Sequence, residues 1–235
     1  MTRRRHRLRR WLAAALIVAV LVSAGGVGLW RLTWMAPTWW APLDPGDEQT
    51  AQLAERVEYR LAEEAHKVRP DPKPWWIEIK QDQINAWLAA RLPEWVAHAH
   101  GIQWPAEVGL PQVNVDAGAV RLGLDIETDA GTRYVVAHLK PSIVEGELAL
   151  TLDGMSVGRL WIPGSSVGAV VDRLEDTGAG RFLDDPGVNA LIGLLEGGRR
   201  IDPTLTLSDG RRVRVLDVRC DRGALLLRAN TLAQE

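Results

Sequence analysis

Apolar side chains recur at every second residue between residues 113 and 152, and this alternation constrains the fold more than any other feature of the chain. Turn sequences containing Gly with Asp or Glu interrupt it at 116–118, 129–131 and 145–146. Because successive side chains of a strand point to opposite faces of a sheet, the pattern predicts an antiparallel meander with one apolar and one wet face. The apolar positions are Val113 and Val115; Val120, Leu122, Leu124 and Ile126; Val135, Ala137 and Leu139; and Leu148, Leu150 and Leu152.

The rest of the chain mixes helical and strand patterns. Residues 48–68 carry one apolar stripe at helical spacing, which predicts a helix that is either a stalk or the first layer of the domain. A strand over 75–80 and an amphipathic helix from Gln81, interrupted by Pro93, follow. After the meander the sequence predicts a strand at 158–162, helices from 165 and over 188–195, and final strands at 205–207, 213–215 and 225–227.

These elements predict an α+β fold. We expect a curved antiparallel sheet, a meander, packed against amphipathic helices and preceded by one transmembrane helix. The extracytoplasmic α+β domain is predicted to cover residues 48–235.

The N-terminal region predicts a membrane anchor. Residues 11–30 contain no charged side chain, and twenty helical residues span about 30 Å, the thickness of a bilayer core. Residues 1–10 hold six arginines, which predicts a cytoplasmic N-terminus and an extracytoplasmic domain, periplasmic or on the outer surface of the cell membrane. A Pro- and Trp-rich linker is expected over 31–47. The predicted interfacial anchors are Trp11, Trp30, Trp34, Trp39 and Trp40.

A removable secretory signal is the alternative to a permanent anchor. The small residues of Val22-Ser23-Ala24 satisfy the rule for a cleavage site. The uncharged run continues past that site to Trp30, which favours the anchor. Both interpretations place the domain outside the cytoplasm.

Charge and reactive residues argue against several function classes. The whole chain has 28 basic and 30 acidic residues, and six of the basic ones precede the uncharged run, so the remainder has 22 basic and 30 acidic residues, a net charge of −8. This balance argues against a nucleic-acid partner. The side chains of His98 and His100 point in different directions on a helix, so they do not form a metal-binding pair. The row of acidic residues at 125–129 is typical of the solvent-exposed face of a sheet. With one cysteine, Cys220, and five histidines, we expect no metal, no cofactor and no enzymatic activity.

Tryptophan is the unusual residue of the composition, at 11 of the 235 residues. Within the domain, tryptophans are either core residues or the walls of an apolar groove between sheet and helices, where an acyl chain could lie. The candidate groove residues are Trp75, Trp87, Leu88, Trp95, Trp104 and Trp161.

The middle of the chain resembles the YpmS-type bacterial membrane-anchored extracytoplasmic proteins. The resemblance covers roughly residues 75–175 and is carried by a strand-then-helix opening over 77–88, by the hairpin sequence over 140–150 and by Val157-Gly158-Arg159-Leu160-Trp161-Ile162-Pro163. The Pro- and Trp-rich region before residue 75 and the helix at 48–68 depart from that pattern. The resemblance implies a single-pass protein with an extracytoplasmic α+β domain, similar in layout to lipid-cradling sheets, and it implies no activity.

Two functions are consistent with these features. The first is a non-enzymatic domain that binds or hands on an apolar ligand, such as a lipid, near the membrane surface. The second is a structural or adaptor protein of the cell envelope whose packed domain contacts a protein partner. A continuous apolar groove would favour the first, and a filled interior the second.

Overall fold

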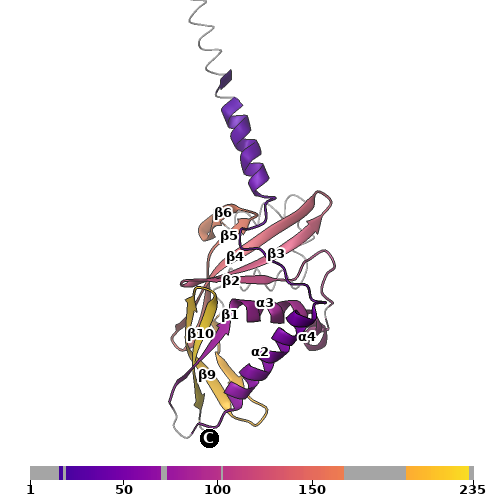
Figure 1. The fold of residues 1–235 in the computed structure, drawn as a ribbon. Helices are drawn as coiled ribbons and strands as arrows, with labels where there is room; N and C mark the ends of the chain where they lie inside the picture. The colour runs from indigo at the N-terminus through magenta and orange to yellow at the C-terminus, as the bar shows by residue number, and fades with distance from the viewer. Residues whose placement is uncertain (1–15, 18–19, 70–72, 102, 167–199, 233–235) are drawn as a thin grey trace, which may run out of the picture.

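The computed structural model describes residues 16–17, 20–69, 73–101, 103–166 and 200–232, and these form an α+β arrangement of two antiparallel sheets with helices (Figure 1). The predicted fold class is therefore confirmed at this level. The predicted helices after residue 166 and over 188–195 lie outside the described residues.

The larger sheet contains the predicted meander. Its strands are β2 (Gln112–Asp116), β3 (Ala119–Thr128), β4 (Gly131–Val144), β5 (Glu147–Val157) and β6 (Leu160–Pro163), in that spatial order, and β7 (Arg200–Ile201) pairs with β5. A short 3₁₀ turn, η1 (Gly164–Ser166), follows β6. Leu122 lies opposite Val113 on one side and Ala137 on the other, so the predicted apolar residues share one face.

The remaining strands form a second sheet, where the sequence predicted only one. The order is β1 (Trp75–Lys80), β10 (Ala224–Leu232), β9 (Arg212–Asp221) and β8 (Thr204–Thr206). Trp75 pairs with Ala229, so the first strand of the domain meets the last. Alternation within a strand does not specify its partner, which is why one sheet was predicted.

The two sheets remain separate because the side chains of Gln81 and Asn85 and the backbone amide of Gly223 close the free edge of β2. Asn85 accepts a hydrogen bond from the Val113 amide at 2.7 Å and donates its own amide to the Val113 carbonyl at 2.9 Å. Gln81 Oε1 accepts from the Val115 amide at 2.8 Å, and the Gly223 amide donates to the Val115 carbonyl at 2.9 Å. The backbone groups that would recruit another strand are therefore occupied, and the bond from Gly223, in the turn between β9 and β10, also joins the two sheets.

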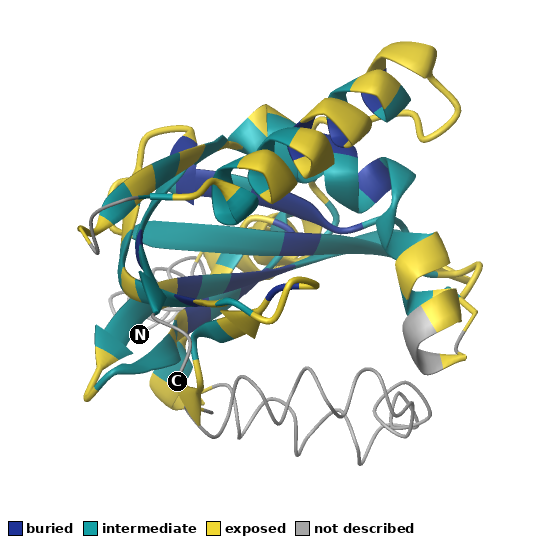
Figure 2. Cartoon of the chain, turned by 90° about the horizontal axis from the view of Figure 1, so that it is seen from below, coloured by how far each residue is buried: buried dark blue, intermediate teal, exposed yellow. Residues whose placement is uncertain are grey.

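The helices pack inside the body of the domain. They are α2 (Glu48–His66), α3 (Gln81–Ala90) and α4 (Leu92–His100). Asp47 caps α2 by accepting from the Thr50 amide, and α2 packs against α3. Ala54 and Val57 are buried, so α2 is a layer of the domain and not a free stalk. Figure 2 shows buried and exposed residues alternating along the helices, while the long strands are mostly half-buried.

The C-terminal end of α2 differs from the prediction. Val68 was expected on the apolar stripe of α2, but the helix ends at His66 and Val68 is 81% exposed. The predicted interruption at Pro93 is a break between two helices, because Pro93 occupies the first turn of α4, where a missing N–H costs nothing.

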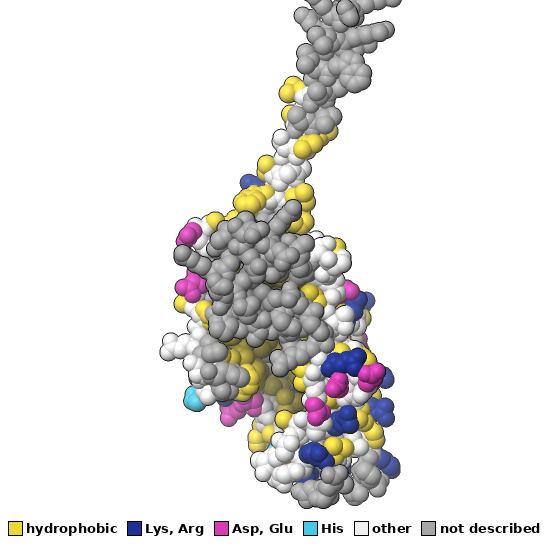
Figure 3. All heavy atoms as spheres, turned by 180° about the vertical axis from the view of Figure 1, so that it is seen from behind, with side chains coloured by type: hydrophobic (Ala, Val, Ile, Leu, Met, Phe, Trp, Pro, Cys, Tyr) yellow, Lys and Arg dark blue, Asp and Glu magenta, His cyan; other side chains and the backbone are white. Residues whose placement is uncertain are grey.

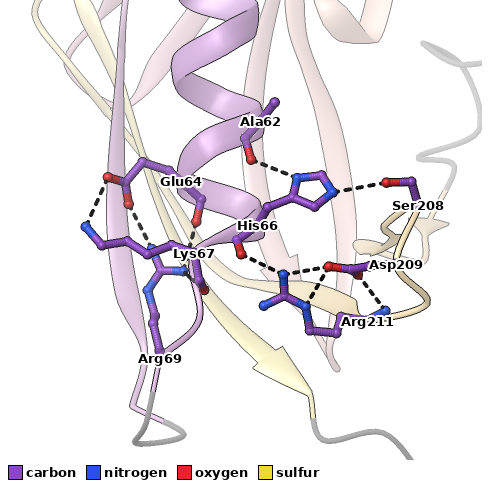
Figure 4. A network of polar contacts seen from close by, with 8 residues as sticks. All are labelled: Ala62, Glu64, His66, Lys67, Arg69, Ser208, Asp209 and Arg211. Carbon is purple, nitrogen blue, oxygen red and sulfur yellow. Dashed lines mark hydrogen bonds and ion pairs between the residues drawn. The ribbon is translucent and has the colours of Figure 1, made fainter.

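A polar network fastens the C-terminal end of α2 to the turn between β8 and β9 (Figure 4). The Arg211 guanidinium donates to the His66 carbonyl at 2.6 Å and pairs with Asp209 at the same distance. The ring of His66 contacts the Ala62 carbonyl at 2.8 Å and the Ser208 hydroxyl at 3.2 Å. These bonds satisfy carbonyl groups that every helix C-terminus leaves open.

Candidate functional site

A helix projects from the body at the end opposite to the four-stranded sheet (Figure 1). Residues 20–32 are helical, and the aliphatic side chains before Trp30 are exposed among the described residues; Leu21 and Val22 are 65% and 69% exposed. An apolar surface of this kind marks a contact with a protein or a membrane. Among the described residues, no helix combines the length and the apolar character needed to cross a membrane. The predicted span over 11–30 lies partly outside the described residues.

The helix joins the body at the turn between β5 and β6. The Arg159 amide donates to the Leu32 carbonyl at 2.9 Å, and its guanidinium donates to the Ala36 carbonyl at 2.8 Å. Gly158 has φ +59°, and a Cβ there would lie 2.3 Å from the Leu32 oxygen. Only glycine combines this backbone conformation with so close an approach.

Arg133 forms the second fastening of the helix. Its guanidinium carbon lies 3.1 Å from the centroid of the Trp34 ring and 5.1 Å from that of Trp30, and its Nη1 donates to the Thr33 hydroxyl at 2.6 Å. The Thr33 hydroxyl in turn donates to the Trp30 carbonyl at 2.7 Å. Burial lowers the pKa of Arg133 below its ordinary value. A guanidinium so placed orients both indoles through cation–π contacts.

The predicted linker over 31–47 is a strap across the sheet and not a free connection. The ring of Trp40 lies 5.4 Å from that of Tyr134 on β4, and a Cβ at Gly123 would lie 2.6 Å from a Trp40 ring atom. The Ala41 amide donates to Gln112 Oε1 at 3.2 Å. The rings of Trp39 and Trp40 lie 5.5 Å apart at a tilt of 57°, and both residues are partly buried against the domain.

The predicted interfacial tryptophans therefore occupy different environments. Trp30 is 61% exposed, while Trp34 is half-buried and its indole N–H has no hydrogen-bond partner among the described residues. Trp39 and Trp40 face the sheet. Trp11 lies outside the described residues. Their role as membrane anchors remains a prediction.

The candidate groove residues do not converge on one place. Trp87 and Trp95 lie 6.5 Å apart on α3 and α4, and the Trp87 indole donates to Glu58 at 2.8 Å. Leu88 is half-buried on α3, whose most buried residues are Ala86 and Ala89.

The other three lie elsewhere in the fold. Trp75 is on β1 of the four-stranded sheet, beneath the guanidinium of Arg69 at 4.0 Å. Trp161 is on β6, 4.4 Å from the His138 ring. Trp104 is in the loop before β2, where its indole donates to the Val108 carbonyl at 2.7 Å. None of the six residues lines either the cavity of about 140 Å³ beside Asn85 or the hollow of about 500 Å³ beside Trp30.

A small cavity of about 140 Å³ does lie between the strap, α3 and β3. Asp125 lines it together with Asn85 and Gln112, and burial raises the pKa of the Asp125 carboxyl above its ordinary value. Within the described residues, no group of three or more His, Cys, Asp and Glu side chains could hold a metal ion. Burial raises the pKa of the Cys220 thiol, which is unfavourable for nucleophilic chemistry.

Sequence analysis did not identify the residues that fasten the helix, Arg133, Gly158 and Arg159. Arg133 stands in an alternating strand pattern, where an arginine is typically solvated. Gly158 and Arg159 belong to an ordinary turn sequence, and nothing local marks them as contacts of residues more than one hundred positions earlier.

Comparison with protein-family models, with curated proteins and with solved structures finds no match to this chain. The resemblance to YpmS-type proteins therefore remains a prediction. The residues that carry it have structural roles here: Asn85 closes the edge of β2, the sequence over 140–150 is the β4–β5 hairpin, and the sequence over 157–163 connects β5 to β6.

Proposed function

We propose that the protein is a single-pass, membrane-anchored extracytoplasmic domain without enzymatic activity, held in a fixed orientation at the membrane surface. The observation that carries this proposal is the double fastening of the helix end to the sheet by Arg133 and Arg159. A helix that only tethered its domain would need no such contacts. The exposed apolar residues of the helix belong to the uncharged run over 11–30.

Transfer of this surface into a bilayer is strongly favourable. Each buried CH₂ contributes about 0.8 kcal/mol, and seven large aliphatic side chains are exposed between residues 16 and 29. These side chains are Leu16, Ile17, Val20, Leu21, Val22, Val27 and Leu29, of which the last five belong to the continuous helical segment. Tryptophan at the helix end suits the boundary between hydrocarbon and water.

A fixed orientation is useful when a binding surface of the domain must lie at a defined distance from the membrane. The four-stranded sheet lies at the end of the body away from the helix (Figure 1). There Trp76 is 46% exposed beneath the guanidinium of Arg219, 5.0 Å from its ring centroid, and Leu205 is 61% exposed. Exposed Trp and Arg are the residue types that contribute most to protein interfaces. We propose this end as the contact surface for an envelope protein, which makes the protein an adaptor.

Binding of an apolar ligand is the second candidate function. It is supported by the pair of Trp87 and Trp95, since Trp95 is 51% exposed beside a neighbouring indole. Figure 3 also shows hydrophobic side chains in a recessed area of the back face, next to a surface where basic and acidic side chains are interspersed. The dispersal of the six candidate residues favours the adaptor.

Anchoring and topology are tested together on the full chain. We expect the protein to stay in the membrane fraction after carbonate washing, and a reporter that is active only outside the cytoplasm to be active when fused after Glu235. Replacement of the six N-terminal arginines by serine should reduce insertion in this orientation. A soluble form that begins at Gly25, or activity of a cytoplasm-only reporter at the same position, would contradict the proposal.

The two candidate functions are separated by their binding partners. Crosslinking from position 76 in intact cells should capture a defined envelope protein if the adaptor function is correct, and Arg219→Gln should weaken this capture. Lipid co-purifying with the protein in a fixed ratio, lost on Trp95→Ala but not on Arg219→Gln, would instead support the apolar ligand.

A further inference from the structure

The end of the N-terminal helix carries an open hollow. Its volume is about 500 Å³, and it is lined by Trp30, Arg31, Trp34 and Met35. Trp30 and Trp34 are one helical turn apart and meet edge to face, with ring centroids 5.8 Å apart. Figure 3 shows hydrophobic side chains and a basic one together where the helix joins the body. The lining therefore combines apolar surface with positive charge.

Among the described residues, the guanidinium of Arg133 beside this hollow forms no ion pair with a carboxylate. Arg133 lies against both indoles, and its only hydrogen bond within the described part of the chain goes to a neutral hydroxyl, that of Thr33. The acidic residues of the same hairpin, Asp125 and Glu127, lie opposite Tyr134 and Thr132 in the register of the two strands. Their side chains therefore point to the sheet face opposite to that of Arg133. A partly buried cation without an anion is costly, and cation–π contacts compensate only part of that cost.

A second guanidinium adds to the site. Arg31 is exposed, and among the described residues its side chain makes no ion pair or hydrogen bond. Guanidinium groups bind phosphate oxygens with two parallel hydrogen bonds, which makes arginine the preferred side chain for phosphate recognition. The described residues that line the hollow include no carboxylate that could bind an ammonium group.

From these observations we propose that Arg31 and Arg133, with Trp30, Trp34 and Met35, form a binding site for the headgroup of an anionic phospholipid. The guanidinium groups bind the phosphodiester, and the indoles and the thioether contact the glycerol and the first methylenes of the acyl chains. The proposal rests on the proposed anchoring, because the helix brings this hollow to the level of the headgroups. An anionic lipid is favoured over a zwitterionic one because the site supplies cations for the phosphate and no anion for a choline.

The test uses the full chain reconstituted in nanodiscs that contain equal amounts of phosphatidylcholine and phosphatidylglycerol. Native mass spectrometry after gentle removal from the nanodiscs measures which lipid stays bound. We expect the unmodified chain to retain phosphatidylglycerol preferentially, and Arg31→Gln to reduce this preference about tenfold, since a charge-assisted hydrogen bond contributes about 1.5 kcal/mol. Arg133→Gln should reduce it further.

Three controls make the outcome decisive. Arg56→Gln removes an exposed arginine of α2 that bonds only to its own helix, at the Gln52 carbonyl, and should leave the preference unchanged. Arg31 holds no part of the fold together, so Arg31→Gln tests the site even if Arg133→Gln fails to fold. Inorganic phosphate at millimolar concentration should not displace the lipid, and complete displacement would identify a site for the free anion instead.

Flotation of the same samples separates failure of this site from failure of the anchor. Protein that does not float with the nanodiscs would contradict the anchoring itself. Protein that floats but retains both lipids equally, or loses its preference equally in Arg56→Gln, would overturn the headgroup site alone.

Discussion

Replacement of Asn85 by alanine should destabilise the domain more than its half-buried position suggests. Among the described residues, the Asn85 amide is the group that pairs the Val113 N–H and C=O, at 2.7 and 2.9 Å, and Val113 is 6% exposed. A buried backbone group left without a partner costs about 1–3 kcal/mol, which gives about 2–6 kcal/mol for the two. Asn85 also lines the cavity of about 140 Å³, so the shortened side chain gives water access to these groups. We therefore expect the lower end, about 2–3 kcal/mol.

The measurement is urea unfolding of the full chain in detergent micelles, followed by tryptophan fluorescence. Amide hydrogen exchange at Val113 should increase in the same variant. Gln52→Ala is the matched control, because the Gln52 amide is exposed and bonds only to Glu48 on its own helix, and it should cost under about 0.5 kcal/mol. If Asn85→Ala costs no more than this control, side chains do not close the edge of β2 and our explanation for the two separate sheets is wrong.

Three further predictions concern the junction, the small cavity and the indole pair. Gly158→Ala should increase hydrogen exchange at the Arg159 amide, because a Cβ would lie 2.3 Å from the Leu32 oxygen. Gly118→Ala is the control, since Gly118 has φ +79° but no atom within 4 Å of the added Cβ, so this variant adds backbone strain alone. Equal increases in exchange in the two variants would argue against a close approach at 158. Asp125→Asn should stabilise the domain at neutral pH, because the raised pKa of Asp125 means that the folded state disfavours the ionised carboxyl. The gain in the free energy of unfolding should shrink as the pH falls through that raised pKa. A gain that grew on acidification would refute this prediction. Trp87→Leu should lower stability by about 1–2 kcal/mol through loss of the bond to Glu58 and the contact with Trp95, while an unchanged melting temperature together with lost binding of a fluorescent fatty acid would favour an apolar ligand groove.

The local parts of the fold were predictable because the signals that specify them are local. Alternation and Gly-containing turns are read within a few residues, and they set the register that places Leu122 opposite Ala137. The interruption of the helix at Pro93 is likewise a property of a single position.

The non-local parts were not predictable in the same way. Trp75 pairs with Ala229 across most of the domain, and alternation in each strand is compatible with many partners. Tryptophan fits a membrane boundary, a groove or a sheet face equally well, so residue type did not reveal that Trp40 packs on Tyr134. Arg133 fastens the N-terminal helix only because the fold places Trp30 and Trp34 next to it.

The central claim, a fixed orientation on the membrane, is tested most directly by measuring the height of the domain. Cys220, the only cysteine, is replaced by serine, and Arg222→Cys in the exposed turn before β10 carries a fluorescent donor, with an acceptor dye on the lipids. We expect a single narrow distribution of single-molecule transfer efficiencies, which broadens when Arg133→Gln and Arg159→Gln are combined and stays narrow in Arg56→Gln. A broad distribution of transfer efficiencies in the protein that keeps both Arg133 and Arg159 would contradict the account.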